Sequence, residues 1–331
     1  MHMKTCCNIP SVIALAVLAT SKLGTTQSHV EVKYLRTILG DSASAIRLAH
    51  PLGMSVDLED NIYIADTGNH RVVKCNLQGK LLREVGGFGF GEQQFDRPVD
   101  VWAGNDLDVF VADYNNQRLQ RYDKDLNFIS SYISNETGDE NLHFGYPAAL
   151  GLSVQGELFV ADHEFNRVLR FDAFGDPKAS FGDFNWGEGG LARPAKIFIS
   201  RRNEVWVSDS SRAAIMVYDT FGNFLRRLGA NTLAAPCGIA EWRHGMIVTD
   251  RERHALSFLG REGESLGEFG ERGKGTNAFE APAAVALLRA AVALLQAAPT
   301  PADRKDASAM HMLVLDSGNH RVQLFEIKWQ P

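Results

Sequence analysis

The pattern of hydrophobic and polar positions along the chain forms a long unit that is repeated six times. Each unit has a proline, an apolar stretch, a turn, a second apolar stretch ending in Asp, a short polar loop and a third apolar stretch. The prolines are Pro51, Pro98, Pro147, Pro194, Pro236 and Pro282, and the aspartates are Asp66, Asp113, Asp162, Asp209, Asp250 and Asp316. The offset from proline to aspartate is 15 in the first four units, 14 in the fifth and 34 in the sixth. Such regularity predicts a repeat architecture.

Each unit carries the apolar residues expected of short β-strands. Three positions before the aspartates stand Tyr63, Phe110, Phe159, Trp206, Ile247 and Val314, which are bulky or β-branched and suit a pleated sheet. Glycines thirteen positions after four of the aspartates indicate tight turns, and a further strand follows, as at 80–85 and 223–228. The unit therefore predicts a four-stranded antiparallel meander of roughly 45 residues, the size of one propeller blade. The predicted fold class is all-β, a six-bladed β-propeller.

The sixth unit stops after its third strand, at 322–328, and so lacks a fourth strand. The N-terminal segment 32–40, VKYLRTILG, resembles a fourth strand such as FLRRLG at 224–229. We therefore expect the N-terminal strand to complete the last blade, which would remove an open sheet edge.

Two segments fall outside the repeat. Residues 1–28 combine Lys4, an apolar run at 12–19 and a polar stretch at 20–28, a pattern typical of a signal peptide and too short to span a bilayer. We expect cleavage and a secreted, periplasmic or extracellular location, with residues 29–331 forming a single propeller domain. An insertion at about 286–309 contains LLRAAVALLQAA, a good helix former, and is expected on the rim opposite the longer loops.

Charge and cysteine content narrow the function classes. The 331 residues carry a formal net charge of −6, which does not favour a general nucleic-acid or membrane-surface binder. Cys75 and Cys237 stand where other units have apolar residues, so we expect buried thiols rather than a disulfide or a metal site.

Binding residues are expected on one rim of the ring. If the strands are named a to d from the channel outward, the b–c loops and the long d–a segments share that rim, and loops on a rigid scaffold usually carry binding. The candidate binding residues in these loops are Tyr114, Phe165, His163, Phe90 and Trp186. The repeated Asp, with an Arg five positions later in four units, indicates a structural contact in which the carboxylate accepts backbone N–H bonds and holds the Arg.

Units 4 and 5 depart from this pattern. Ala214 and Ala255 replace the Arg, and each unit instead has an Arg three positions after its Asp, Arg212 and Arg253, with Arg251 nearby. Either the repeat has drifted, or these arginines form a cluster suited to carboxylate or phosphate groups.

The channel offers a second candidate. The second residue after each proline is expected to face the channel, because the third is apolar and strand residues alternate. This would place Asp100 and Lys196 there, as an ion pair or as an orienting pair for a small ligand.

The sequence also resembles the NHL-repeat family. The segment IADTGNHRVVK at 64–74 is close to the family signature, and LDSGNHRVQ at 315–323 repeats it. The resemblance implies a six-bladed propeller. It constrains function little, since the family includes RNA-binding tripartite-motif proteins and an amidating lyase that holds zinc with channel histidines. No His follows any of the six prolines by one or two positions, and His50, His143 and His163 are scattered near the loop rim.

The favoured interpretation is an extracytoplasmic binding propeller, monomeric and without a cofactor, that recognises a protein or a small anionic ligand through its loop rim. The alternative is a metal-dependent lyase or hydrolase with its site in the channel. RNA binding is less favoured, because it needs a basic loop surface. We expect no DNA partner and no transmembrane span.

Overall fold

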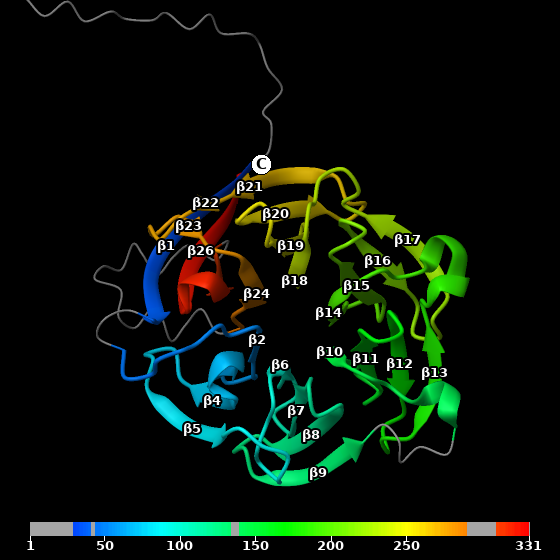
Figure 1. The fold of residues 1–331 in the computed structure, drawn as a ribbon. Helices are drawn as coiled ribbons and strands as arrows, with labels where there is room; N and C mark the ends of the chain where they lie inside the picture. Colours follow the sequence, from blue (N-terminus) through cyan, green and yellow to red (C-terminus); the bar gives the residue numbers. More distant parts are fainter. Residues whose placement is uncertain (1–28, 41–43, 134–138, 290–308, 331) are drawn as a thin grey trace, which may run out of the picture.

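Six four-stranded antiparallel sheets surround a central channel as the blades of a propeller (Figure 1). The computed structural model describes residues 29–40, 44–133, 139–289 and 309–330. Blade 1 contains β2 (Gly53–Val56), β3 (Ile62–Asp66), β4 (Arg71–Cys75) and β5 (Leu81–Gly86), and blade 2 contains β6 (Pro98–Trp102), β7 (Asp108–Asp113), β8 (Arg118–Asp123) and β9 (Phe128–Ile133). Blade 3 contains β10 (Pro147–Leu152), β11 (Leu158–Asp162), β12 (Arg167–Phe171) and β13 (Pro177–Phe181). The predicted architecture is confirmed.

The remaining blades follow the same order. Blade 4 contains β14 (Pro194–Ile199), β15 (Val205–Asp209), β16 (Ala214–Tyr218) and β17 (Phe224–Leu228). Blade 5 contains β18 (Pro236–Trp242), β19 (Gly245–Asp250), β20 (Ala255–Gly260) and β21 (Ser265–Phe269). Short 3-10 turns occupy loops: η1 (Thr67–Asn69), η3 (Glu140–Leu142), η4 (Phe184–Gly189) and η5 (Ser317–Asn319). A two-residue parallel pair, β22 (Glu271–Arg272) with β23 (Ala278–Phe279), lies between blades 5 and 6.

Blade 6 is completed by the N-terminal strand, as the sequence predicts. Its sheet order is β1 (His29–Leu39), β26 (Arg321–Gln330), β25 (Met310–Asp316) and β24 (Pro282–Leu287). The antiparallel register runs from His29 opposite Gln330 to Leu39 opposite Val322. Strands from the two ends of the described chain therefore close the ring (Figure 1).

The core lies between neighbouring blades. The apolar residue nine positions after each Asp is at most 2% exposed in every blade: Cys75, Tyr122, Phe171, Tyr218, Leu259 and Phe325. Cys75 and Cys237 are buried free thiols, as expected. Burial raises the pKa of Cys75 to about 12.

The repeated Asp joins the loop before its blade to the b–c loop within it. In blade 1, Asp66 accepts hydrogen bonds from the backbone N–H of Ala49 at 2.7 Å and from Nε of Arg71 at 2.8 Å. This confirms the structural role predicted for the Asp and Arg pair. In blade 5, which lacks the Arg, the carboxylate of Asp250 instead accepts four backbone N–H groups. Asp209 of blade 4 does the same. Backbone amides thus replace the missing guanidinium.

Three histidines connect successive blades. The residue four positions after the Asp has a left-handed backbone in every blade. Where that residue is His, its Nδ1 accepts the N–H of the residue preceding the next blade's proline. His70 bonds Arg97 at 3.1 Å, His254 bonds Ala281 at 3.0 Å, and His320 bonds His50 at 3.0 Å. The last of these contacts links blade 6 to blade 1.

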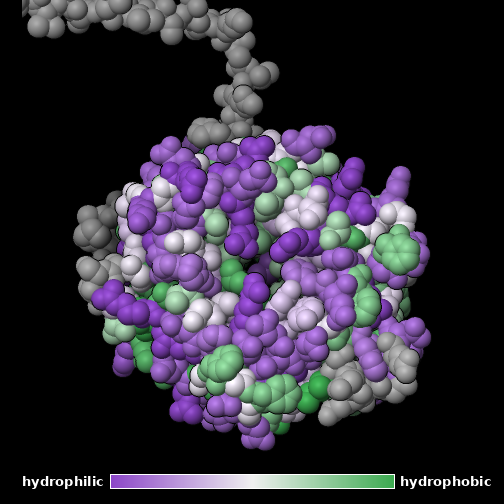
Figure 2. All heavy atoms as spheres, in the orientation of Figure 1, coloured by the Kyte–Doolittle hydropathy of each residue, from purple (hydrophilic) through white to green (hydrophobic). Residues whose placement is uncertain are grey.

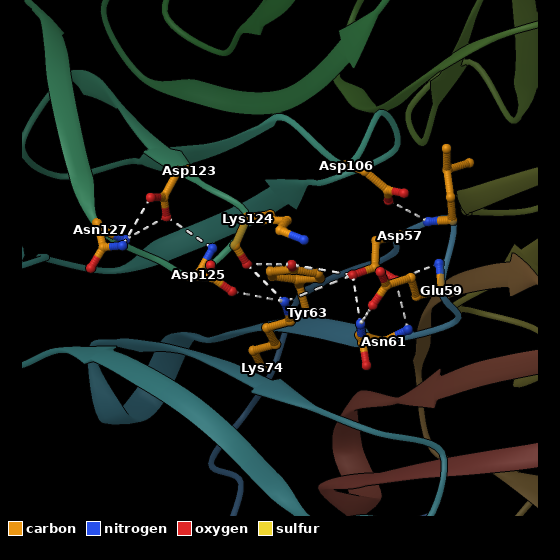
Figure 3. Close-up of polar contacts among 11 residues, drawn as sticks. Asp57, Glu59, Asn61, Tyr63, Lys74, Asp106, Asp123, Lys124, Asp125 and Asn127 are labelled. Carbon is orange, nitrogen blue, oxygen red and sulfur yellow. Dashed lines mark hydrogen bonds and ion pairs between the residues drawn. The ribbon is translucent and has the colours of Figure 1, made fainter.

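On the rim opposite these loops, a polar cluster connects blades 1 and 2 (Figure 3). The carbonyl oxygen of Lys124 accepts the Tyr63 hydroxyl at 2.7 Å and Nζ of Lys74 at 2.8 Å. Nζ of Lys74 also lies 3.9 Å from carboxylates of Asp57 and Asp125. Burial and Asp57 raise the pKa of Tyr63. The Lys74 ammonium thus compensates the acidic groups, and the cluster is an inter-blade contact.

Two expectations fall on segments that the structure does not describe. The signal peptide, residues 1–28, lies outside the described residues, and so does most of the insertion at about 286–309, including the expected helix. Within the described ranges, no helix has the length and apolar character needed to cross a membrane.

Candidate functional site

The channel mouth on the loop rim is built from two loops of each blade. In blades 2 to 5, the residue after the Asp donates its backbone N–H to the carbonyl of the residue before the proline. Tyr114 bonds Arg97 at 3.3 Å in blade 2, Ser210 bonds Arg193 at 3.1 Å in blade 4, and Arg251 bonds Ala235 at 3.0 Å in blade 5. In blade 3, His163 bonds Tyr146 at 3.0 Å. These pairs place equivalent residues at equivalent positions around the channel.

A cavity of about 510 Å³ occupies this mouth. Its apolar wall comes largely from the residues directly after the prolines: Leu52, Val99, Ala148, Ala195, Cys237 and Ala283. Its polar wall is Arg97, Tyr114, His163, Arg193, Lys196, Ser210, Arg251 and Glu252. Figure 2 shows a hollow at the centre of the disc, surrounded by hydrophilic atoms. The volume is that of a small-molecule pocket.

The cavity carries unneutralised positive charge. Arg97, Arg193 and Arg251 are exposed residues, and among the described residues no carboxylate forms an ion pair with any of them. Glu252 is the one acidic residue in the cavity lining. Guanidinium groups present a planar fork of donors that fits carboxylate or phosphate. The cavity is therefore locally cationic although the whole chain is acidic.

Lys196 lines the cavity, but its charge is compensated. Its Nζ forms an ion pair with Asp100, reaching from blade 4 to blade 2 across the intervening blade. The Asp100 carboxylate also accepts the backbone N–H of Leu150 in blade 3 at 2.9 Å. The predicted ion pair is present, and it joins three consecutive blades.

The expectation that the second residue after each proline faces the channel holds for Lys196, which lines the cavity, but is wrong for Asp100 and the other four positions, which are buried. Asp100 is only 2% exposed, and a Cβ at Gly53 or Gly238 would meet the backbone of the next blade's inner strand at 2.6 Å. The register shifts directly after the proline, as between Pro98 and Asp100, so strict alternation does not hold there. The two faces of the inner strand pack between blades, and the residue after the proline lines the cavity instead.

Tyr114 and His163 form a polar pair in the cavity wall. Nε2 of His163 lies 2.7 Å from the carbonyl oxygen of Pro194, which can only accept, so Nε2 carries the proton. Nδ1 is then free to accept from the Tyr114 hydroxyl, 3.4 Å away. The guanidinium of Arg97 lies 5.0 Å from the centre of the Tyr114 ring. Burial lowers the pKa of His163, and nearby Arg193 and Arg97 lower it further.

The three arginines of blades 4 and 5 are not brought together. Arg251 lines the cavity. Arg253 pairs with Glu268 at 3.1 Å, both of them partly exposed. Arg212 lies beside Gly190 at the end of the η4 loop, and its Nε has no hydrogen-bond partner. Arg97 and Arg193, which were not among the predicted binding residues, line the cavity together with Arg251.

The predicted aromatic residues are spread over the loop rim. Tyr114 lines the cavity and stacks on Tyr146 with 5.0 Å between ring centres. Phe90 is 57% exposed and lies over the guanidinium of Arg118, while Phe165, 49% exposed, lies over that of Arg167. Trp186 belongs to η4, and its side chain is outside the described part.

The cavity lining does not fit a zinc site of the kind that the resemblance to an amidating lyase implies. Zinc is held by three or four His, Cys or acidic ligands, and the lining offers His163, Glu252 and the buried thiol of Cys237. Across the described ranges, no three such side chains are grouped so that they could hold a metal. The scattered histidines do not converge either, because His50 packs against His320 in blade 6. We therefore derive no metal-dependent step.

Fold and cavity together define a six-bladed β-propeller with a cationic pocket at one mouth of its channel. The NHL repeat model matches residues 48–75 and 95–122, which lie in blades 1 and 2. The chain therefore carries NHL repeats, as its sequence signature indicates.

Similar proteins include some whose names state no activity and some that are named as lyases. Mouse NHL repeat-containing protein 3 is 28% identical over 37% of this chain and 39% of its own length. A probable peptidyl-alpha-hydroxyglycine alpha-amidating lyase of Caenorhabditis elegans is also 28% identical, over 37% of each chain. The matches thus span about two fifths of these relatives. A Staphylococcus aureus virginiamycin B lyase structure superposes with a TM-score of 0.57 and 13% identity, covering 90% of this chain and 99% of that one, which shows a common fold.

Proposed function

We propose that the protein binds a small anionic ligand in the cavity at the channel mouth. The observation that carries the proposal is the set of three cavity arginines, Arg97, Arg193 and Arg251, which have no acidic partner among the described residues. Elsewhere in the propeller, arginines of the same loops do pair with acids, as Arg71 with Asp66 and Arg118 with Asp113. This difference supports a ligand as the source of the neutralising charge in the cavity.

The shape of the site supports this proposal. Loops from several blades contribute to one concave pocket, and the blades beneath hold them rigidly. The backbone of Arg251 is held at the mouth by its bond to Ala235. The hydroxyl groups of Tyr114 and Ser210 contact Nδ1 of His163 at 3.4 Å and the carbonyl oxygen of Arg193 at 3.3 Å, and a carboxylate or phosphate would compete with these acceptors for their protons.

The test is ligand-induced stabilisation measured by thermal unfolding at constant ionic strength. Citrate, succinate and phosphate serve as probes, because an anion that binds only the folded state raises the melting temperature. We expect at least one of them to stabilise the wild type and to stabilise Arg251→Gln much less. The matched control is Arg253→Gln, a neighbouring loop arginine already paired with Glu268, which should respond like the wild type. Equal responses in all three proteins, or no response to any anion, would refute the proposal.

The alternative of a metal-dependent lyase or hydrolase stays a prediction. Relatives named as lyases favour it, while the cavity lining supplies too few ligands for the expected zinc. Elemental analysis of the purified protein distinguishes the two, because stoichiometric metal would support the alternative. The expectation that a protein partner binds this rim is likewise a prediction.

A further inference from the structure

The cationic groups of the cavity come from opposite sides of the ring. Arg97 directly precedes β6, the inner strand of blade 2, and Arg251 directly follows β19 of blade 5. The inner strands form a ring in the order β2, β6, β10, β14, β18 and β24, so blades 2 and 5 are three steps apart in either direction. Figure 1 shows β6 and β18 facing each other across the channel.

The two arginines also lie at the same level of the mouth. The backbone bond from Tyr114 to Arg97 in blade 2 is equivalent to the bond from Arg251 to Ala235 in blade 5. Arg97 is thus the acceptor of this bond in blade 2, and Arg251 is its donor in blade 5, on the opposite side of the ring. Both arginines line the same cavity.

Part of the wall between these charges is apolar. Leu52, Val99, Ala148 and Ala283 contribute side chains without hydrogen-bonding groups. Blades 3 and 4 add the polar residues His163, Arg193, Lys196 and Ser210 on the other side. At one end, Arg97 lies against Tyr114, which contacts His163. At the other end stands Arg251.

We propose that the cavity selects a dicarboxylate, a ligand with two carboxylate groups joined by a short aliphatic chain. The inference rests on the proposed anion-binding function and specifies its ligand class. One carboxylate lies at Arg97 and the other lies at Arg251. A ligand with a single charge would neutralise only one of these two guanidinium groups, whereas a two-ended ligand neutralises both. The aliphatic chain lies along the apolar wall.

The experiment compares each dicarboxylate with its own half-neutralised form. Succinate, glutarate, adipate and suberate are titrated calorimetrically into the full chain at constant ionic strength, beside their monomethyl esters. We expect an optimum chain length, at which the diacid binds about tenfold or more tightly than its monoester, the loss expected for one charge-assisted contact. Equal affinities of diacid and monoester would overturn the proposal while leaving anion binding intact. Binding of neither would refute the anion-binding function itself.

Arginine variants assign the two ends. Arg97→Gln and Arg251→Gln should each weaken the best diacid about tenfold and bring the ratio of diacid to monoester affinity close to one. The control Arg253→Gln should retain the wild-type ratio. A ratio that survives in both cavity variants would overturn the two-ended arrangement. Because each variant is scored by a ratio of two ligands on one protein, a general loss of folding cannot imitate the expected result.

Discussion

Arg118→Met should destabilise the propeller strongly, although it changes a single side chain at the start of β8. The guanidinium donates to Asp113 at 2.8 Å and to the carbonyl oxygens of Phe90, Gly91 and Gln94 at 2.6, 3.0 and 2.8 Å. The Arg118 side chain is 4% exposed and that of Asp113 is fully buried. Met keeps the aliphatic volume but removes the charge and all four donors.

The magnitude follows from the carboxylate that is left behind. Breaking one partner of a buried ion pair costs about 3–5 kcal/mol, because the remaining charge has no compensation. Burial already raises the pKa of Asp113, while Arg118 opposes that shift. Without the Arg the folded-state pKa rises further above the unfolded value. The variant's extra instability should therefore grow as pH increases from about 4 to 7, since the unfolded state then holds fewer protons than the folded state.

Urea unfolding followed by tryptophan fluorescence measures the free energy of unfolding. Arg253→Met is the matched control, because its partly exposed pair with Glu268 is worth about 0–1 kcal/mol. The double variant Asp113→Asn with Arg118→Met should be more stable than Arg118→Met alone at pH 7, since the uncompensated charge is gone. A loss of less than about 1 kcal/mol in Arg118→Met, or equal losses in both single arginine variants, would refute the buried-charge argument.

Three further predictions concern other parts of the molecule. Deleting residues 29–41 removes the strand that pairs with β26 and that contains the buried Leu39. The free energy of unfolding should fall by several kcal/mol, at roughly 25 cal/mol per Å² of lost burial, and the melting temperature should fall with it. An unchanged melting temperature would contradict ring closure. If residues 1–28 are a signal peptide, mass spectrometry of natively exported protein should give a start between residues 17 and 30, and intact Met1 in cytosolic protein would count against export. Burial lowers the pKa of His163, so at acidic pH the unfolded state binds more protons than the folded state. The stability that neutral His163 contributes is complete above about pH 6.5 and should be lost as pH falls. His163→Asn should flatten the slope of unfolding free energy between about pH 5 and 6.5, and an unchanged slope would show that His163 is not responsible.

The fold was predictable because the repeat places the same chemistry at the same offset in every blade. The aspartates, the apolar positions after them and the missing fourth strand of the sixth unit all indicated the ring that the structure shows. The alternation of inward and outward residues does not hold where the register shifts after the proline, as it does between Pro98 and Asp100. Asp100 was therefore predicted to face the channel, although it is buried between blades.

The cavity was only partly predictable from the sequence. Tyr114, His163, Lys196 and Arg251 were selected, but Arg97 and Arg193 were not. Their signal was present in the residue preceding each proline, which is Arg in blades 2 and 4 only. What the sequence could not show is that this residue pairs with the one following the Asp, a contact between loops about 17 positions apart. The histidine contacts between blades were missed for the same reason.

The completed sixth blade also determines when the protein can become stable during synthesis. Strand β1 is made first, and its partner β26 is made last, so Leu39 and Ile38 have no sheet to join until Arg321–Gln330 has left the ribosome. Pairing between such distant segments is slow, because a large loop must close before the contacts form. The first five blades must therefore persist as an open arc with unpaired edges, a state exposed to aggregation and chaperone binding. The same strand that protects the finished ring makes its assembly wait until β26 has been made.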